Sequence, residues 1–195
     1  DAQESRGLGD VYKRQDKDLR VIKTKKALTD SLYSLLEQEM FTTLTVNNIC
    51  KHASVHRTTF YKHFYDKYEL LKYLLKLTHN DYFATNIKER LNNPFQTLAN
   101  SFNKEEISRI ELKQYNDKEF EDVRNNYLIE IMQKDFKTNM HRITVDNVVP
   151  KSLVFYVFGS VLNAFIDWKK NENVEIKPKQ MDQIFHKLIN VKAHD

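Results

Sequence analysis

The chain has 195 residues, which is long enough to bury a substantial core, so a disordered chain is not expected. Only 3 Gly and 3 Pro accompany 41% hydrophobic and 30% charged residues, a composition that favours helices and supplies few turns for a sheet protein. The single cysteine, Cys50, rules out an internal disulfide, and the lack of a long apolar run argues against a membrane span or a secretory signal. The sequence therefore predicts an all-α protein in a reducing cytoplasm.

The net charge of +4 is unevenly distributed along the chain. The excess of Lys and Arg lies in residues 16–79, whereas acidic and basic side chains balance over residues 80–195. A basic segment favours a polyanion such as nucleic acid as partner. A basic solvated surface without such a partner is an equal alternative on charge alone.

Residues 1–15 show no helical periodicity, and their segment Asp-Val-Tyr-Lys-Arg-Gln at 10–15 resembles the in-frame translation of a sequencing-library adapter. We therefore expect residues 1–15 to be an assembly artefact. The fold prediction begins at Asp16.

Three helices are predicted in the next fifty residues. A stripe of leucines at helical spacing predicts the first, over residues 17–39. Thr45 can cap a short helix that ends near His52, and a three-residue turn then leads into a helix over residues 56–63. Two short helices joined in this way describe a helix-turn-helix. The side chains expected to form its small core are Leu36, Phe41, Val46, Ile49, Cys50, Val55, Phe60 and Phe64.

The following pattern also predicts helices. Asp66 and Glu69 have the spacing of a capping box, which starts a helix that continues to about Ala84. Residues 94–150 are expected to divide into three helices at breaks near residues 103, 116 and 149. Aromatic side chains in this stretch either line a ligand cavity or belong to the core, and the core is the favoured reading. They are Phe95, Phe102, Tyr115, Phe120, Tyr127 and Phe136.

The C-terminal third carries more apolar surface than one chain of this size can cover. Residues 151–170 are apolar on all sides, and residues 179–192 contain a second apolar stripe. Pairing with a second copy covers both helices, and Gly159 would allow another backbone to approach closely. A monomeric helical core that tolerates this glycine is the alternative.

The residues around the turn carry a family resemblance. Residues 44–64 read Leu-Thr-Val-Asn-Asn-Ile-Cys-Lys-His-Ala-Ser-Val-His-Arg-Thr-Thr-Phe-Tyr-Lys-His-Phe, and Asp-Lys-Tyr-Glu-Leu-Leu follows at 66–71. This segment, with its flanking helices, resembles the DNA-binding domain of TetR/AcrR transcription regulators. The resemblance implies a helix-turn-helix domain at 16–79 and a helical dimerisation and effector-binding domain at 80–195. Phe-Gly at 158–159 and Phe-Ile-Asp-Trp at 165–168 resemble a Firmicutes-type subgroup of that family.

In this reading the second helix of the motif enters the major groove. His56, Arg57, Thr58 and Thr59 lie at its N-terminal end, which faces base edges. The remaining candidates would lie nearer the DNA backbone, and the resemblance assigns Tyr61 and Lys67 to phosphates. The complete predicted DNA-binding set is Thr45, His56, Arg57, Thr58, Thr59, Tyr61, Lys62, His63 and Lys67.

Two residues depart from the family pattern. Ser54 stands where the family usually has the glycine of the turn, and a left-handed serine costs on the order of 1 kcal/mol. His56 replaces a small polar N-cap, which leaves the base preference at that position open and would make binding weakly pH-dependent.

These features predict a repressor that binds a palindromic operator as a homodimer and is released by a small-molecule inducer. The alternative is a ligand-independent architectural or division-linked DNA-binding protein of the same fold. The sequence has no phosphate-cradling Gly loop, no nucleophile motif and no Cys/His cluster, so neither an enzyme nor a cofactor or metal is expected, and no membrane partner.

Overall fold

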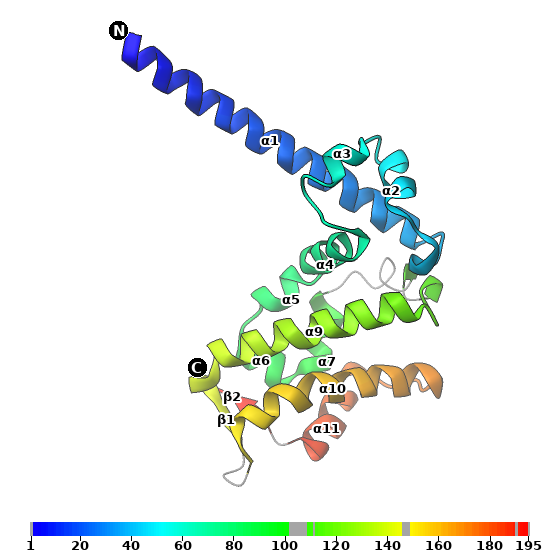
Figure 1. Ribbon diagram of the computed structural model, residues 1–195. Coiled ribbons are helices and arrows are strands. Elements are labelled where there is room, and N and C mark those ends of the chain that lie inside the picture. The colour runs from blue at the N-terminus through cyan, green and yellow to red at the C-terminus, as the bar shows by residue number, and fades with distance from the viewer. Residues whose placement is uncertain (1, 102–108, 111, 146–148, 190, 195) are drawn as a thin grey trace. The chain divides into compact units, whose positions relative to one another are not determined.

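The computed structural model describes the whole chain except residues 1, 102–108, 111, 146–148, 190 and 195 (Figure 1). It divides into two compact units. Unit 1 comprises residues 1–74 together with 110–120, and unit 2 comprises residues 75–109 and 121–195. Unit 1 therefore combines the N-terminal helices with a segment from the middle of the chain.

Unit 1 is helical and has one small core. Its elements are α1 (Ala2–Leu36), η1 (Phe41–Thr43), α2 (Val46–His52), α3 (Arg57–Phe60) and the first two turns of α4 (Lys67–Thr78). The leucine stripe of α1 is buried, as its spacing predicts, although α1 runs from Ala2 to Leu36 rather than from residue 17 to residue 39. Of the expected core, only Val46 and Val55 are half-buried. The buried members are Leu36, Phe41, Ile49, Cys50, Phe60 and Phe64.

Local hydrogen bonds define both ends of α2. The Thr45 hydroxyl accepts from the Asn48 N–H at 3.2 Å, and the Asn48 side-chain oxygen accepts from the Thr45 N–H at 3.2 Å. This reciprocal capping confirms Thr45 as the N-cap. At the other end Ser54 is left-handed, with φ 55°. The Ser54 and Val55 N–H groups donate back to the Lys51 and Cys50 carbonyls, so the predicted turn is a Schellman motif.

Because Ser54 holds a conformation that suits glycine, Ser54→Gly should raise the free energy of unfolding by about 0.5–1 kcal/mol. Ala53, with φ −76°, offers a matched control, and Ala53→Gly should lower stability by a similar amount. Urea unfolding of both variants measures the two changes. Equal destabilisation by both glycines would contradict the strain at Ser54.

Capping also starts α4 where the sequence predicts it. The Glu69 N–H donates to the Asp66 carboxylate at 2.8 Å, and the Glu69 carboxylate accepts from the Tyr65 N–H. The predicted continuation to residue 84 is wrong in one respect, because α4 ends at Thr78 and α5 (Asn80–Ala84) follows after a break. At the break the ring of His79 turns back onto the Leu75 carbonyl at 2.8 Å.

Unit 2 contains the remaining elements. They are α5, α6 (Ile87–Asn92), α7 (Pro94–Ser101), α9 (Lys118–Thr138, from Glu121 onward), η2 (Met140–Arg142), β1 (Ile143–Val145), α10 (Lys151–Asn171), α11 (Pro178–Leu188) and β2 (Val191–Ala193). The expected break near residue 116 is present, and that near residue 103 lies outside the described residues. No helix of the described residues is both long and apolar enough to cross a membrane.

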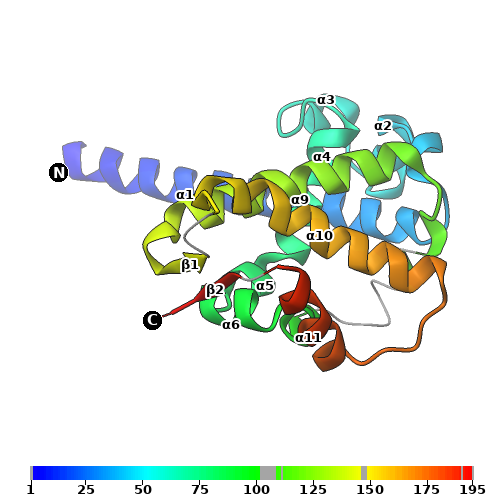
Figure 2. The ribbon, with the colours of Figure 1, turned by 90° about the horizontal axis from the view of Figure 1, so that it is seen from below.

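A small antiparallel sheet replaces the end of the last predicted helix. The sequence predicts a helix throughout residues 179–192, but α11 ends at Leu188 and β2 follows (Figure 2). β2 pairs with β1, with Ile143 opposite Ala193. The Asn92 side chain holds both backbone polar groups of Ala193, at 3.0 and 3.1 Å. The chain is extended here because its backbone hydrogen bonds go to partners distant in sequence.

Aromatic rings interlock in the core of unit 2. Phe185 lies 5.2–5.8 Å, centroid to centroid, from Phe95, Phe158 and Phe165, and Phe158 lies 5.0 Å from Phe136. All five side chains are buried, so Phe95 and Phe136 belong to the core. Phe102 lies outside the described residues.

Gly159 makes its close approach within the chain. A Cβ atom at this position would lie 3.1 Å from the Met132 sulfur of α9. The glycine therefore lets α10 pack on the Met132 side chain within the chain. Close approach of a second copy's backbone at Gly159 stays a prediction.

Candidate nucleic-acid interface

The short helix α3 presents polar side chains and is anchored by a buried one. Phe60 is fully buried, which orients the helix on the core of unit 1. The side chains around its N-terminal end are exposed, except Thr59, which is half-buried. The exposed members of the predicted set are Thr45, His56, Arg57, Thr58, Tyr61 and Lys62. This arrangement offers hydrogen-bond donors and the cations of Arg57 and Lys62 on a surface that a nucleic acid could reach.

Arg57 and Tyr61 contact each other across one helical turn. The Arg57 guanidinium lies 6.0 Å from the Tyr61 ring centroid, and its Nη2 lies 3.5 Å from the Tyr61 hydroxyl. The hydrogen bond and the charge interaction with Tyr61 raise the pKa of Arg57, so the group keeps its charge. Residues four apart share a helical face, so both side chains project from the same side of the motif.

His63 differs from its exposed neighbours. It is half-buried, and burial, followed by the nearby charges of Lys25 and Lys62, lowers its pKa. The imidazole is therefore mostly neutral at neutral pH and can contact DNA as a hydrogen-bonding group rather than as a cation. His56 occupies the N-cap of α3, and its side chain makes no capping hydrogen bond.

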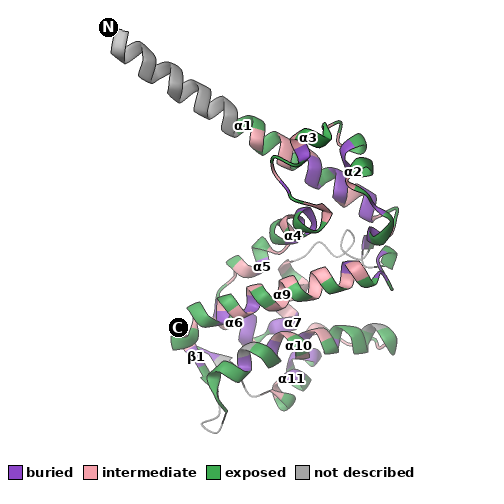
Figure 3. Cartoon of the chain, viewed as in Figure 1, coloured by how far each residue is buried: buried purple, intermediate pink, exposed green. Residues whose placement is uncertain are grey.

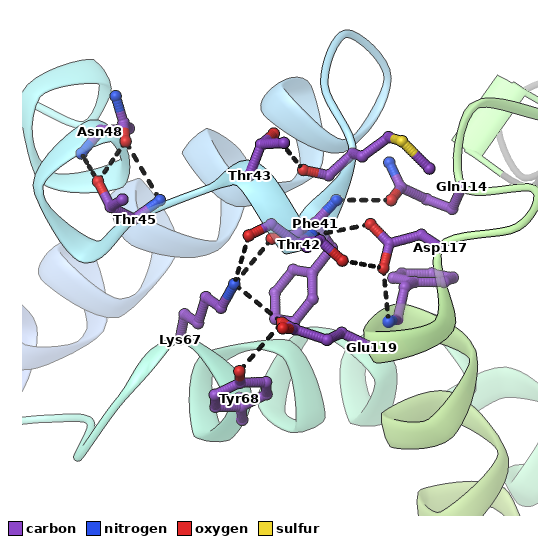
Figure 4. Close-up of polar contacts among 12 residues, drawn as sticks. Phe41, Thr42, Thr43, Thr45, Asn48, Lys67, Tyr68, Gln114, Asp117 and Glu119 are labelled. Carbon is purple, nitrogen blue, oxygen red and sulfur yellow. Dashed lines mark hydrogen bonds and ion pairs between the residues drawn. The ribbon is translucent and has the colours of Figure 1, made fainter.

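Lys67 is held by partners within the protein (Figure 4). Its ammonium donates to the Phe41 carbonyl at 2.9 Å and the Thr42 carbonyl at 3.3 Å, and lies 3.1 Å from the Glu119 carboxylate. The side chain is only 13% exposed, and its ammonium also lies 4.5 Å from the Phe41 ring centroid. A phosphate contact by Lys67 stays a prediction, and a phosphate would have to compete with these partners.

Sequence reasoning did not find the residues from the middle of the chain that contact this site. Gln114, Asp117 and Glu119 lie in unit 1 beside η1 and α4. They are separated from their partners by at least 51 residues, and no periodicity or capping pattern connects them.

Comparison with known proteins agrees with this geometry. Residues 28–74 match the bacterial regulatory proteins of the tetR family, while no curated protein shows significant similarity to the chain. A TetR transcriptional regulator from Streptococcus agalactiae superposes with a TM-score of 0.61 at 21% identity, covering 90% of this chain and 98% of its own. The chain has the TetR fold.

Two further solved structures share this fold. A protein from Syntrophomonas wolfei assigned to the TetR family gives a TM-score of 0.55 at 17% identity, over 84% of this chain and 93% of its own. The multidrug binding protein EbrR, solved with imidazole, gives 0.53 at 11% identity, over 85% and 94%. The all-α prediction with an N-terminal helix-turn-helix is thereby confirmed.

The lowered pKa of His63 predicts a pH dependence of stability. The unfolded chain binds a proton near the ordinary pKa of about 6.5, whereas the folded chain resists it. The contribution of neutral His63 to the free energy of unfolding is therefore fully present above that pH. It is lost as the pH falls toward the pKa of His63 in the folded chain. The His63→Gln variant should lose less unfolding free energy than wild type between about pH 7.5 and about pH 5.5. Urea unfolding across this range tests it, and parallel curves would contradict the burial of His63.

Proposed function

We propose that this chain is a member of the TetR family that represses transcription by binding a palindromic operator as a homodimer. The observation that carries the proposal is the pair α2–α3, whose buried base supports an exposed face bearing Arg57 and Tyr61. The match of residues 28–74 to the tetR family supports it. A partner on the chromosome would place the protein in the cytoplasm. Its assignment to a Firmicutes-type subgroup stays a prediction.

The exposed end of α3 would read bases in the major groove. There Arg57 can pair with O6 and N7 of guanine, and Thr58 can touch a thymine methyl. His56 would also lie near the base edges, while half-buried Thr59 has less surface to offer. Tyr61, Lys62 and His63, together with the exposed Thr45 hydroxyl, would contact the DNA backbone.

The C-terminal helices support the proposed homodimer. One face of α10 packs in the core of unit 2 through Val154, Phe158, Leu162 and Phe165. Its other face remains exposed (Figure 3), so α10 is not covered on all sides within one chain. The exposed apolar side chains are Leu153, Tyr156, Val157, Ile166 and Trp168 on α10, and Ile184 and Leu188 on α11. An apolar surface of this kind is the usual mark of an interface.

Charge placed on that face should therefore separate the subunits. Tyr156→Glu should shift the protein from dimer to monomer at micromolar concentration, because a carboxylate would be buried without a partner. Ser152→Glu, at an exposed polar position of the same helix, adds the same charge and should leave the dimer intact. Sedimentation velocity measures both. A monomeric wild type, or equal loss of dimer in the two variants, would contradict an interface at Tyr156.

Selection of DNA tests the proposed activity directly. The full chain is incubated with random-sequence duplexes, and bound DNA is amplified and sequenced. A palindromic consensus with half-sites about one helical turn apart is expected from a symmetric dimer. If no duplex sequence is enriched after repeated rounds, the proposal is wrong.

Genome-wide footprinting then separates the proposed repressor from the architectural alternative. A repressor should occupy one or a few sites near promoters, whereas an architectural protein should occupy many. Because EbrR is a multidrug binding protein of the same fold, a panel of chemically different small drugs is a suitable first set of compounds for a release assay. Release of the selected duplex by any of them would support an inducer-controlled repressor.

Arg57 provides the sharpest test of base reading. Arg57→Ala should weaken binding of the selected duplex by roughly 1–3 kcal/mol and relax the preference at one position of each half-site. Binding of a scrambled duplex should change much less. Lys134→Ala removes one charge from an exposed site on α9 in unit 2 and serves as the control. If Arg57→Ala weakens both duplexes equally, α3 does not read bases through Arg57.

A further inference from the structure

The backbone between α1 and α2 is held by a buried glutamine from the middle of the chain (Figure 4). Gln114 is only 2% exposed, and its side chain forms hydrogen bonds with backbone groups of residues 36–41. Its oxygen accepts from the Phe41 N–H at 2.8 Å. Its nitrogen donates to the Leu36 carbonyl at 2.6 Å and the Glu39 carbonyl at 2.8 Å. One side chain therefore satisfies the end of α1 and the start of η1.

Asp117 holds the next residue in the same way. It is 1% exposed, and its carboxylate accepts from the Thr42 N–H at 2.8 Å and from the Thr42 hydroxyl at 2.6 Å. The same carboxylate accepts from the Phe120 N–H at 3.1 Å, at the first turn of α9. Burial acts to raise the pKa of Asp117, but the hydrogen bonds from Thr42, Phe120 and Glu119 outweigh it and lower the pKa. The group is thus an ionised acceptor, and hydrogen bonds to it are strong ones.

Lys67 and Glu119 complete the set of contacts. The Lys67 ammonium donates to the carbonyls of Phe41 and Thr42. The N–H groups of the same two residues donate to Gln114 and Asp117. Glu119 pairs with Lys67 at 3.1 Å and accepts from the Tyr68 hydroxyl at 3.0 Å. The N–H groups of Phe41 and Thr42 therefore have side-chain partners in the segment 114–119. Their carbonyl groups have a side-chain partner in α4.

These contacts lie three residues before Thr45, which caps α2. We propose that Gln114 and Asp117, with Lys67 and Glu119, are positioning residues of the DNA-binding site, which hold residues 41–42 and thereby set where α2 and α3 begin. The inference rests on the proposed DNA-binding function. In this view the geometry of the DNA-binding site does not depend on residues 16–79 alone. It also depends on the segment 114–119, more than thirty residues further along the chain.

Thr42 allows the proposal to be tested without disturbing the core. Thr42→Val keeps the shape of the side chain but removes the hydroxyl that donates to Asp117, whereas Thr42→Ser keeps the donor. We expect Thr42→Val to bind the selected duplex about tenfold more weakly, the scale of a lost hydrogen bond to a charged acceptor. Thr42→Ser should bind within about twofold of wild type.

Asp117→Asn is the complementary change, because its amide would bring a donor toward the Thr42 N–H. It should also weaken binding about tenfold. Asp122→Asn, at an exposed position of α9, changes the net charge equally and should bind as wild type does. Far-UV circular dichroism checks that every variant is folded at the assay temperature. If Asp117→Asn does not fold, the Thr42 pair decides.

Amide hydrogen exchange gives a readout independent of DNA. Residues 41–52 should exchange faster in Thr42→Val and Asp117→Asn, while α11 in unit 2 should exchange at the wild-type rate. Variants that bind within twofold of wild type, even with a lower unfolding midpoint, would overturn the proposal and leave these contacts a purely stabilising role. If wild type selects no duplex, the proposed function fails, and exchange alone decides whether residues 41–52 are positioned by these contacts.

The salt dependence of the Lys67→Gln variant separates positioning from a phosphate contact. A positioning role predicts weaker binding with an unchanged slope of log affinity against log salt. A phosphate contact in each subunit predicts that the slope falls by about 2. The second result would remove Lys67 from the proposed set.

Discussion

Phe41 is the residue at which the parts of unit 1 meet. Its ring is fully buried and lies edge-on to Tyr68 of α4 and to Phe120 of α9, at 5.6 and 6.4 Å between centroids. Its N–H is bound by Gln114 and its carbonyl by Lys67. A buried backbone group without a partner would cost about 1–3 kcal/mol, so the apolar and polar contacts at this residue require each other. The position of α2, and so the proposed interface, depends on this junction.

The same division between packing and polar anchoring recurs in unit 2. Interlocked rings around Phe185 supply the apolar core. Polar side chains then connect the helices. Asp182 on α11 accepts from the Phe95 N–H at 2.7 Å. Arg90 on α6 forms a bidentate ion pair with Asp135, at 2.6 and 3.0 Å. Aromatic packing buries one face of α10, and the apolar side chains on its other face are exposed.

The sequence alone determined the features that depend on near neighbours. Thr45 and Asp66 as caps, the tight turn at 53–55 and the buried leucines of α1 all follow from the local spacing of residues along the chain. Helical spacing and capping act over this range, so they can be read without a fold. The exposure of Arg57 also follows, because Phe60 on the same short helix must face the core.

Only the tertiary structure decided the features that join distant residues. Gln114 and Asp117 reach residues 41 and 42 over 73 and 75 positions. Lys67, an expected phosphate ligand, is bound by the Phe41 carbonyl and by Glu119. In the same way β2 leaves the helical pattern because Ala193 pairs with Ile143, and Gly159 is explained by Met132 of another helix. Glutamine, aspartate and lysine have the same local preferences whether they are solvated or buried. Their roles are set by which backbone groups need a partner once the chain is packed.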